Sequence, residues 1–513
     1  MKMIVVFLSL TALWLSFVMP NQAAGATKPN VIIIFTDDQG FADLGCQGSV
    51  KDIRTPNLDR IAREGVRCTA GYVTAPQCSP SRAGLLTGRY QERFGFDRIG
   101  HGPLPLEEET LATRLQKAGY VTGMVGKWHL DPSSWDTEWV QKNFPDVKLT
   151  KQVDAYGRAL TAKGDPVVIP PEMIAPYYPG ARGFADFFYG FMAPYLVNYD
   201  VNGKSLKPEG QWIKSTAFRI DIQSDAACAF IRRHQTQSGH ASDGATPPFF
   251  LYLAYAAPHV PLEAPEKYLN RFPGTMPQRR RVALAMLSAI DDGVGRILDM
   301  LAELKIDENT LIIFCSDNGA PLYVNKADKP IIPGLAWDAS WDGSLNDPWL
   351  GEKGMLTEGG IREPFLLRFK GVLPAGKVYD EPISTLDIVP TVLALAGQPK
   401  AADLDGVNLL PYLTGQQAET PHEYLYWRFF SQEAVRAGQW KYLRLSDGTE
   451  YLFDLSTPAQ ESKNVLAAHV DIAARLKERL AGWAQEMKPS GLLHGPIQPG
   501  EVEWYSGHEI GQH

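Results

Sequence analysis

The sequence predicts an α/β fold, with a large mixed, mostly parallel sheet sandwiched by helices and a smaller C-terminal antiparallel sheet with one helix. Continuous apolar, β-branched runs at 30–36 and 310–316 have the pattern of strands that are buried on both faces. Amphipathic stretches lie between such runs, and this alternation predicts a doubly wound sheet. After about Gly397 the pattern changes to short alternating aromatic segments with an Asp-Gly turn, which favours antiparallel strands.

The main sheet is expected to use four strands and three covering helices that can be placed from the pattern. The strands are expected at 30–36, 247–255, 310–316 and 363–371, and the helices at 57–65, 110–118 and 280–304. In doubly wound sheets, ligands bind beyond the carboxyl ends of the strands. Two pairs of polar residues follow buried runs at this edge, namely Asp37-Asp38 and Asp317-Asn318.

The chain divides into four segments in this interpretation. Residues 1–26 have the features of a secretory signal peptide, with one lysine, an apolar run from Ile4 to Met19 and an Ala-x-Ala ending. A transmembrane anchor is the alternative, but the run is shorter than the roughly 20 residues that a span needs. We therefore expect an exported protein, periplasmic or secreted, without a membrane span after signal removal. The other segments are the main domain at 27–400, an α+β subdomain at 401–488 and an irregular tail at 489–513.

Charge and cysteine content limit the possible partners. The formal net charge of -8 argues against a nucleic-acid surface, and an anionic substrate would need local cations. The five cysteines allow two disulfides at most, so one cysteine must stay unpaired. Cys78 is the candidate for that unpaired residue.

The two acidic strand ends predict a metal site. Adjacent Asp37 and Asp38 can converge only where the backbone turns beyond the strand, since neighbouring side chains of a strand point to opposite faces. With Asp317 and the amide oxygen of Asn318 they would provide four hard oxygen ligands, which favours Ca²⁺, with Mg²⁺ second. Loop capping is the alternative for each pair. Two pairs at equivalent strand ends favour the metal.

Cys78 lies in the stretch APQCSPSRAGLLTGRY, residues 75–90. Pro80 suits the first turn of a helix and Gly88 its end, so Cys78 is expected just ahead of a helix N-terminus. Backbone N–H groups and the helix dipole favour an anion there, which would activate a thiolate. The alternative is a cysteine that serves as a small buried hydrophobe.

The segment from Cys78 to Arg82, followed by AGLLTGR, resembles the Cys-x-Pro-x-Arg signature of the type I, formylglycine-dependent sulfatases of the alkaline phosphatase-like superfamily. Further segments occur in the order expected for that family, so that the resemblance covers most of the chain: DDQGFADLGCQG (37–48), GKWHL (126–130), APHVPL (257–262), SDNG (316–319) and GEKGMLTEGGIREP (351–364). The chain also resembles bacterial carbohydrate sulfatases. The resemblance implies that a formylglycine-generating maturation enzyme converts Cys78 to formylglycine during export.

The resemblance also implies a binding role for each matching residue. The divalent ion would be held by Asp37, Asp38, the modified Cys78, Asp317 and Asn318. Lys127 and Lys353 would bind the sulfate oxygens and stabilise their growing charge. Arg82 would hold the formylglycine hydrate in place. Solvated surface lysines are the alternative for the two cations.

Proton transfer would involve three further groups of the same set. Asp317 would accept the proton of the attacking hydroxyl, and His259 would protonate the departing alcohol oxygen. His129 would accept the proton of the second hydroxyl, which expels sulfate as the aldehyde re-forms. Structural, hydrogen-bonded histidines are the alternative.

Two unusual loops suggest the substrate. A long insertion separates GKWHL from Arg182, and the loop 320–350 carries Trp337, Trp341 and Trp349 among aspartates. Aromatic faces commonly pack against sugar rings, so Trp337 and Trp341 are candidate substrate contacts, with ordinary loop packing as the alternative. The sequence thus predicts an exo-acting sulfatase for a sulfated carbohydrate, with galactose or N-acetylgalactosamine as candidates. Aryl or other small-molecule sulfatase, phosphonate or phosphate ester hydrolase and non-catalytic glycan-binding protein are the alternatives.

Overall fold

The computed structural model describes residues 28–512 except 101, 134–135, 147, 154–158, 162, 166, 237–245, 334–339, 459 and 490–499. The expected signal peptide at 1–26 lies outside the described residues. Among the described residues, none of the helices combines the length and the apolar character that a bilayer crossing requires.

The main sheet is built around β1 (Asn30–Asp37), which pairs in parallel with β9 (Phe249–Pro258) and with β10 (Thr310–Ser316). The strand order is β12-β2-β11-β10-β1-β9-β3-β6-β7-β8, with β13 beside β2. The strand β11 (Arg362–Arg368) runs antiparallel to β10 and β2. The other strands are β2 (Val66–Tyr72), β3 (Val121–Gly126), β6 (Asp186–Tyr189), β7 (Tyr195–Val197), β8 (Gln211–Ile213), β12 (Lys377–Tyr379) and β13 (Ile383–Ser384). The predicted mixed, mostly parallel sheet is confirmed.

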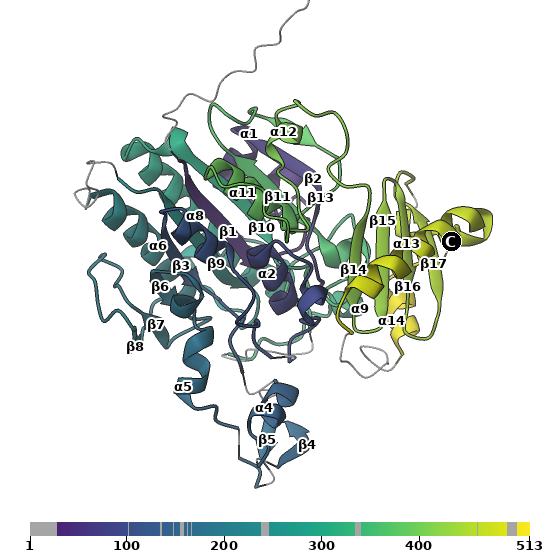
Figure 1. Cartoon of the computed structure of the whole chain (residues 1–513), viewed down its shortest axis with the longest axis horizontal. Coiled ribbons are helices and arrows are strands. Elements are labelled where there is room, and N and C mark those ends of the chain that lie inside the picture. The colour runs from purple at the N-terminus through teal and green to yellow at the C-terminus, as the bar shows by residue number, and fades with distance from the viewer. Residues whose placement is uncertain are drawn as a thin grey trace, which may run out of the picture.

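Both faces of this sheet are covered by helices (Figure 1). Alternate residues of β1 enter two different cores, with Ile32 and Ile34 in one and Ile33 and Phe35 in the other. Burial on both sides explains the unbroken apolar run of β1. The first core includes α1 (Pro56–Arg63), α6 (Arg219–Thr236) and α8 (Gln278–Glu303), and the second includes α2 (Cys78–Thr87), α3 (Leu111–Lys117) and α11 (Ile388–Leu395).

The C-terminal subdomain is a four-stranded antiparallel sheet covered by α13 (Val470–Glu486), drawn in green to yellow in Figure 1. Its strands are β14 (Leu425–Phe429), β15 (Gln432–Ala437), β16 (Trp440–Arg444) and β17 (Glu450–Asp454). The predicted irregular tail is wrong in part, because α14 (Glu501–Gly507) forms within it. Tyr505 and Ile510 are buried against this sheet. Their burial stabilises a helix that the local sequence pattern does not predict.

The insertion after GKWHL folds into small elements that project at the bottom of Figure 1. They are α4 (Thr137–Asn143), the paired β4 (Leu149–Val153) and β5 (Ala159–Thr161), and α5 (Pro171–Ile174). The remaining short helices are α7 (Glu266–Leu269), α9 (Tyr323–Lys326), α10 (Glu358–Ile361) and α12 (Leu410–Leu413).

Candidate functional site

The predicted acidic residues converge at the carboxyl edge of the central strands. The strand β1 ends at Asp37, and Asp38 adopts a left-handed backbone with φ of 61°. The Asp38 N–H donates to Asp317 Oδ1 at 3.1 Å, which links the ends of β1 and β10. One ligand atom from each of Asp37, Asp38, Cys78 and Asp317 lies within 4.8 Å of the others. The turn after β1 therefore allows adjacent aspartates to face one centre, as the sequence predicts.

Asn318 completes this cluster and carries an unsatisfied oxygen. Its side-chain N–H groups donate to Asp38 Oδ1 at 2.7 Å and to the Gly319 carbonyl at 2.9 Å. Its Oδ1 is buried and has no hydrogen-bond partner among the described residues. Buried acceptors of this kind are rare without a partner. Three carboxylates and one free amide oxygen are a donor set that fits a hard divalent cation such as Ca²⁺.

Cys78 is the first residue of α2, and Gly88 ends this helix in a left-handed conformation with φ of 68°. Its Sγ lies 3.4 Å from Asp37 Oδ1 and 3.3 Å from Lys353 Nζ. Burial and the neighbouring Asp317 raise the pKa of the thiol well above its usual value. Complete burial beside carboxylates thus outweighs the nearby lysines, which opposes activation of a thiolate in the cysteine form.

Arg82 lies one turn after Cys78 on the same face of α2. The guanidinium is fully buried, and its Nε and Nη2 donate to Asp317 Oδ2 at 3.1 and 2.6 Å. Its Nη1 donates to the Lys127 carbonyl at 3.1 Å. Arg82 thus fixes the position of Asp317 and of the segment that carries Lys127.

Two lysines border Cys78 from different parts of the chain. Lys127 follows β3 and places its Nζ 2.7 Å from Asp37 Oδ2. Lys353 lies in a glycine-rich loop, and its Nζ is 2.6 and 2.8 Å from the Asp38 carboxylate oxygens. Burial opposes ionisation of Asp37, but Lys127 and the other nearby cations outweigh it and hold the pKa of Asp37 well below its usual range. Neither lysine is a solvated surface residue, so both can bind an anion at this site.

Two histidines face the same centre. His259 follows β9, and its Nδ1 lies 2.7 Å from the Val260 carbonyl, which can only accept. Its Nε2 therefore carries no proton in the neutral ring, and it lies 3.6 Å from Asp38 Oδ2. Burial lowers the pKa of His259 to about 4. Burial and Lys127 also hold the pKa of His129 well below its usual value, and the buried Nδ1 of His129 has no partner among the described residues.

The prediction of Trp341 as a substrate contact is wrong. Trp341 is 4% exposed, packs with Ala320 and Leu322, and donates its indole N–H to the Ser344 carbonyl at 2.7 Å. Trp337 lies outside the described residues. Sequence reasoning missed Phe191, whose ring centroid lies 5.3 Å from that of His259. The aromatic run at 187–191 was the available signal, but nothing local distinguishes its site residue from its core residues.

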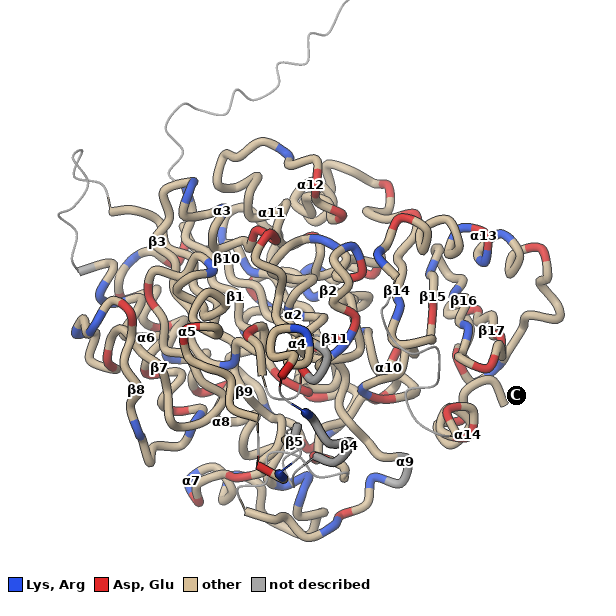
Figure 2. Tube along the Cα trace, turned by 60° about the horizontal axis from the view of Figure 1, so that its bottom comes forward, with Lys and Arg blue, Asp and Glu red and all other residues tan. Residues whose placement is uncertain are grey.

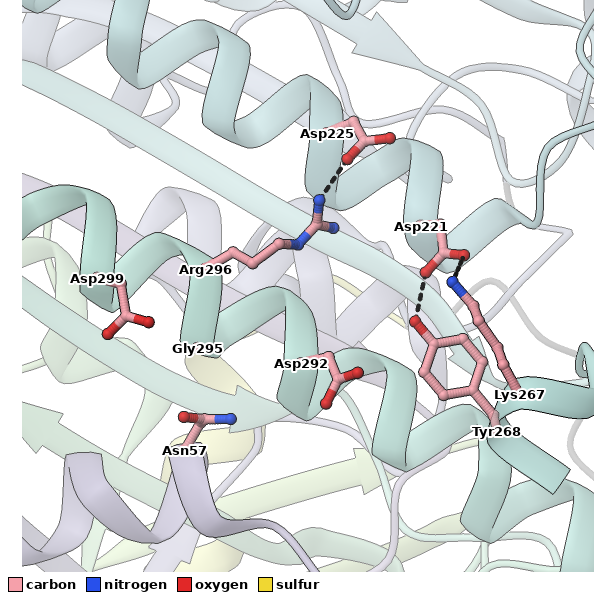
Figure 3. Close-up of a pocket in the computed structure, with 9 residues that line it drawn as sticks. All are labelled: Asn57, Asp221, Asp225, Lys267, Tyr268, Asp292, Gly295, Arg296 and Asp299. Atoms are coloured by element: carbon pink, nitrogen blue, oxygen red, sulfur yellow. Dashed lines mark hydrogen bonds and ion pairs between the residues drawn. The ribbon is translucent and has the colours of Figure 1, made fainter. Parts of the chain in front are cut away.

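A separate cavity of about 470 Å³ lies on the helical face formed by α1, α6, α7 and α8 (Figure 3). Its charged groups largely pair with one another, as in the contacts of Asp225 with Arg296 and of Asp221 with Lys267. This cavity contains none of the predicted site residues. Figure 2 shows acidic and basic positions interspersed along the described chain.

Comparisons with known proteins agree with this site. A family model described as Sulfatase matches residues 29–162 and 234–398, and one described as N-sulphoglucosamine sulphohydrolase, C-terminal, matches residues 348–486. N-acetylgalactosamine-6-sulfatase of Canis lupus familiaris is 34% identical over 436 residues, covering 82% of this chain and 72% of the relative. Steryl-sulfatase of Homo sapiens is 30% identical over 479 residues, covering 83% and 75%.

One solved structure is similar to this chain over almost its whole length. The structure of Ps i-CgsB in complex with k-i-k-neocarrahexaose has a TM-score of 0.70 and 28% identity, and the match covers 94% of this chain and 97% of that one. The family match spans more than half of the chain, and it includes the segments that carry the converging cluster. The chain therefore belongs to the sulfatase family and is a sulfuric ester hydrolase.

Proposed function

We propose that this enzyme hydrolyses a sulfate ester on a carbohydrate, after conversion of Cys78 to formylglycine and with a Ca²⁺ ion held by Asp37, Asp38, Asp317, Asn318 and the modified residue 78. The observation that carries this proposal is the position of Cys78, which is buried between three carboxylates and the Lys353 amine. The negatively charged sulfate ester needs such a cation, and a divalent ion needs such carboxylates. The export signal expected at 1–26 agrees with maturation during export to the periplasm or the medium.

A carbohydrate substrate is supported by the similar proteins. One relative is described as N-acetylgalactosamine-6-sulfatase, and one similar structure holds a neocarrahexaose. Steryl-sulfatase is similar to nearly the same extent, so family membership alone does not select the alcohol. We propose exo action on a galactose or N-acetylgalactosamine sulfate.

The residues around position 78 have different roles in sulfate binding and proton transfer. Formylglycine would supply a hydroxyl of its hydrated aldehyde as the nucleophile, and the cation would supply positive charge to the sulfate oxygens. Lys127 and Lys353 bind the remaining sulfate oxygens and favour the charge that grows on them. Asp317, held by the Arg82 guanidinium, accepts the proton of the attacking hydroxyl.

His259 would protonate the departing alcohol oxygen from Nε2. Because the Val260 carbonyl keeps a proton on Nδ1, a second proton must be bound at Nε2. A bound sulfate ester adds negative charge near the ring and raises the pKa of His259 from the low value that burial causes. His129 accepts the later proton that accompanies sulfate release.

The direct test is an assay of matured protein against sulfated saccharides, aryl and choline sulfates, and phosphate monoesters, with released sulfate or phosphate measured by ion chromatography. Sulfate release from a saccharide, with none from Cys78→Ala, is the expected result. Exclusive turnover of non-sugar sulfates would contradict the carbohydrate assignment, and preferential turnover of phosphate esters would contradict the sulfatase chemistry.

A further inference from the structure

We use the name sulfate pocket for the site around Cys78 that Lys127, Lys353 and His259 border. An aromatic side chain, Phe191, lies beside this pocket next to His259. Phe191 is half-buried and contacts the His259 ring edge-on, at 5.3 Å between centroids. The Lys127 Nζ lies 5.4 Å from the same ring centroid, and the Arg219 guanidinium carbon lies 5.2 Å from it. Because His259 must face the departing oxygen, the group that bears the sulfate has to lie next to Phe191.

Phe191 lies two residues after Tyr189, the last residue of β6, and further aromatic rings lie around Tyr189. Tyr189 donates its hydroxyl to Asp131 Oδ2 at 2.8 Å, and its ring lies 5.6 Å from Tyr178 and 6.4 Å from Trp212. Tyr189 pairs with Leu196 and Leu196 with Trp212, so the three side chains share one face of β6, β7 and β8. Trp212 is 55% exposed, which leaves a large ring of this face open to a ligand.

We propose that Phe191, Tyr189, Tyr178 and Trp212 form the binding surface for the sulfated pyranose and its neighbouring sugar. This rests on the proposed function. Aromatic faces pack against the C–H faces of pyranose rings, and the Asp131 carboxylate beside Tyr189 can accept hydrogen bonds from sugar hydroxyls. These four residues, and not the buried Trp341, are the proposed carbohydrate contacts.

Kinetics of Trp212→Ala with two substrates test this surface. The ratio of kcat/KM for a sulfated oligosaccharide to kcat/KM for 4-nitrophenyl sulfate is expected to fall about ten-fold, or about 1.4 kcal/mol, because the second sugar loses the ring on which it stacks. Trp440→Ala, which removes a partly exposed ring of the C-terminal sheet, is the control that leaves the ratio unchanged. An unchanged ratio in Trp212→Ala would overturn the proposal.

Binding to an inactive variant separates this inference from the proposed function. Calorimetry with a sulfated oligosaccharide and Cys78→Ala should give a dissociation constant that increases about ten-fold when Trp212→Ala is added. If the matured enzyme hydrolyses only phosphate esters, the proposed function fails, while this titration still tests the sugar surface. Equal binding by both variants would contradict the surface.

The C-terminal helix carries a second, independent inference. The Glu352 carboxylate is 3% exposed, and its Oε1 accepts from Trp504 Nε1 at 2.6 Å and from His508 Nε2 at 3.0 Å. Its Oε2 accepts the N–H groups of Leu322 and Tyr323 at 2.5 and 2.6 Å. Glu352 immediately precedes Lys353, so these bonds join α14 and its C-terminal end to both loops that close one side of the sulfate pocket.

The backbone that follows Lys353 is also linked to α14 by hydrogen bonds. The Tyr505 hydroxyl accepts from the Leu356 N–H at 3.2 Å and donates to Gln432 Oε1. Gln432 Nε2 in turn donates to the Gly354 carbonyl at 3.3 Å. Contacts from α14 therefore restrain the backbone on both sides of a lysine whose Nζ lies 3.3 Å from Cys78 Sγ.

We infer that Trp504 and His508 are positioning residues that hold Lys353 against the sulfate. The test is Trp504→Phe combined with His508→Leu, which keeps apolar bulk but removes both donors to Glu352. Loss of two hydrogen bonds to a charged group should raise KM and the inhibition constant of inorganic sulfate about ten-fold, with a smaller change in kcat. Glu503→Gln, an exposed change on the same helix, is the control.

Two further readouts distinguish positioning from general destabilisation. Thermal unfolding and the formylglycine content of the peptide around residue 78 should match between the double variant and Glu503→Gln when sulfate affinity falls. Unchanged sulfate inhibition in a folded, matured double variant would overturn the inference. A parallel loss of stability and maturation without a change in sulfate affinity would also contradict it.

Discussion

At the scale of single residues, burial controls the reactivity of the Cys78 thiol. In the cysteine form, the thiol is buried and its pKa is raised, so it is protonated and a weak nucleophile at neutral pH. The surrounding lysines and carboxylates are arranged for an oxygen anion and a cation rather than for thiolate chemistry. This agrees with a cysteine that serves as the precursor of another group.

Cys78→Ala is expected to lower turnover of the best sulfate ester at least 10³-fold, because the nucleophile is lost while the pocket remains. Truncation of one small buried side chain should cost about 1–2 kcal/mol of stability, so the variant should stay folded. Initial rates of sulfate release and thermal unfolding check both parts. Turnover near the parent level would contradict the assigned nucleophile.

Asn318→Ala is expected to weaken calcium binding about 10-fold or more, since it removes an oxygen donor that has no other partner in the described structure. Calcium titration of chelator-treated protein, followed by calorimetry, measures this change. Asn198→Ala is a matched control, because Asn198 is also buried, and its side chain accepts from the Phe187 N–H and donates to the Ala185 carbonyl beside the sheet edge. An equal calcium affinity in Asn318→Ala and the parent would remove Asn318 from the ligand set.

The sequence predicts the central site well and its border poorly. Asp37, Asp38 and Asp317 follow recognisable strands, so their meeting at one edge follows from topology. The pKa of Cys78 could not be obtained from its helical position, because burial was the larger effect. The burial of Trp341 depends on three-dimensional packing that no local pattern encodes.

At the scale of elements, α8 is tied to the start of α1 by one carboxylate. Asp291 accepts the N–H groups of Asn57 and Leu58 at 2.8–3.2 Å, so it caps the first turn of α1. Burial raises the pKa of Asp291 to about 6. Since the folded protein binds this proton more tightly than the unfolded chain, stability from this group is complete below about pH 4 and is lost as the pH rises through 6.

Asp291→Asn should therefore reduce the difference in free energy of unfolding between pH 4.5 and pH 7.5 by roughly 2 kcal/mol relative to the parent. Urea denaturation at the two pH values measures this difference. Asp292→Asn is the neighbouring control, because Asp292 is partly exposed and pairs with Arg271 near the surface. A parent and Asp291→Asn with the same pH dependence would show that this carboxyl does not titrate in that range.

The elements that the sequence predicts include the central strands and α8, which have long regular patterns, but not the 18-residue α6. The central strands are apolar throughout, and α8 repeats its apolar face over 26 residues. The strands β6, β7 and β8 are three or four residues long, so their alternation is too short to be recognised. The helix α14 was missed because its stability comes from Tyr505 and Trp504 packing on a distant sheet.

At the scale of the whole molecule, a buried ionic network joins the two sheets. Lys441 of β16 is fully buried and places its Nζ 2.9 Å from both Glu358 and Glu461. Glu358 belongs to α10, which directly follows the loop that carries Lys353, and it also accepts from Tyr72 at 2.5 Å. The C-terminal subdomain is thus attached to the main domain close to the sulfate pocket.

Lys441→Met is expected to destabilise the protein by about 3–5 kcal/mol, because it leaves the buried Glu461 carboxylate without this cation and removes one of the two ion pairs of Glu358, which still pairs with Arg362. Lys477→Met removes the exposed partner of Glu450 and should change stability by less than about 1 kcal/mol. Chemical denaturation of the two variants and the parent gives both values. A Lys441→Met protein as stable as Lys477→Met would show that the network does not hold the subdomain.

The most direct measurement of the central claim is mass spectrometry of the proteolytic peptide that contains residue 78, made on a preparation whose rate of sulfate release is measured in parallel. The account predicts that residue 78 carries an aldehyde in place of its thiol, and that the modified fraction rises in proportion to the rate. A fully active preparation in which this residue is entirely unmodified cysteine would contradict the account.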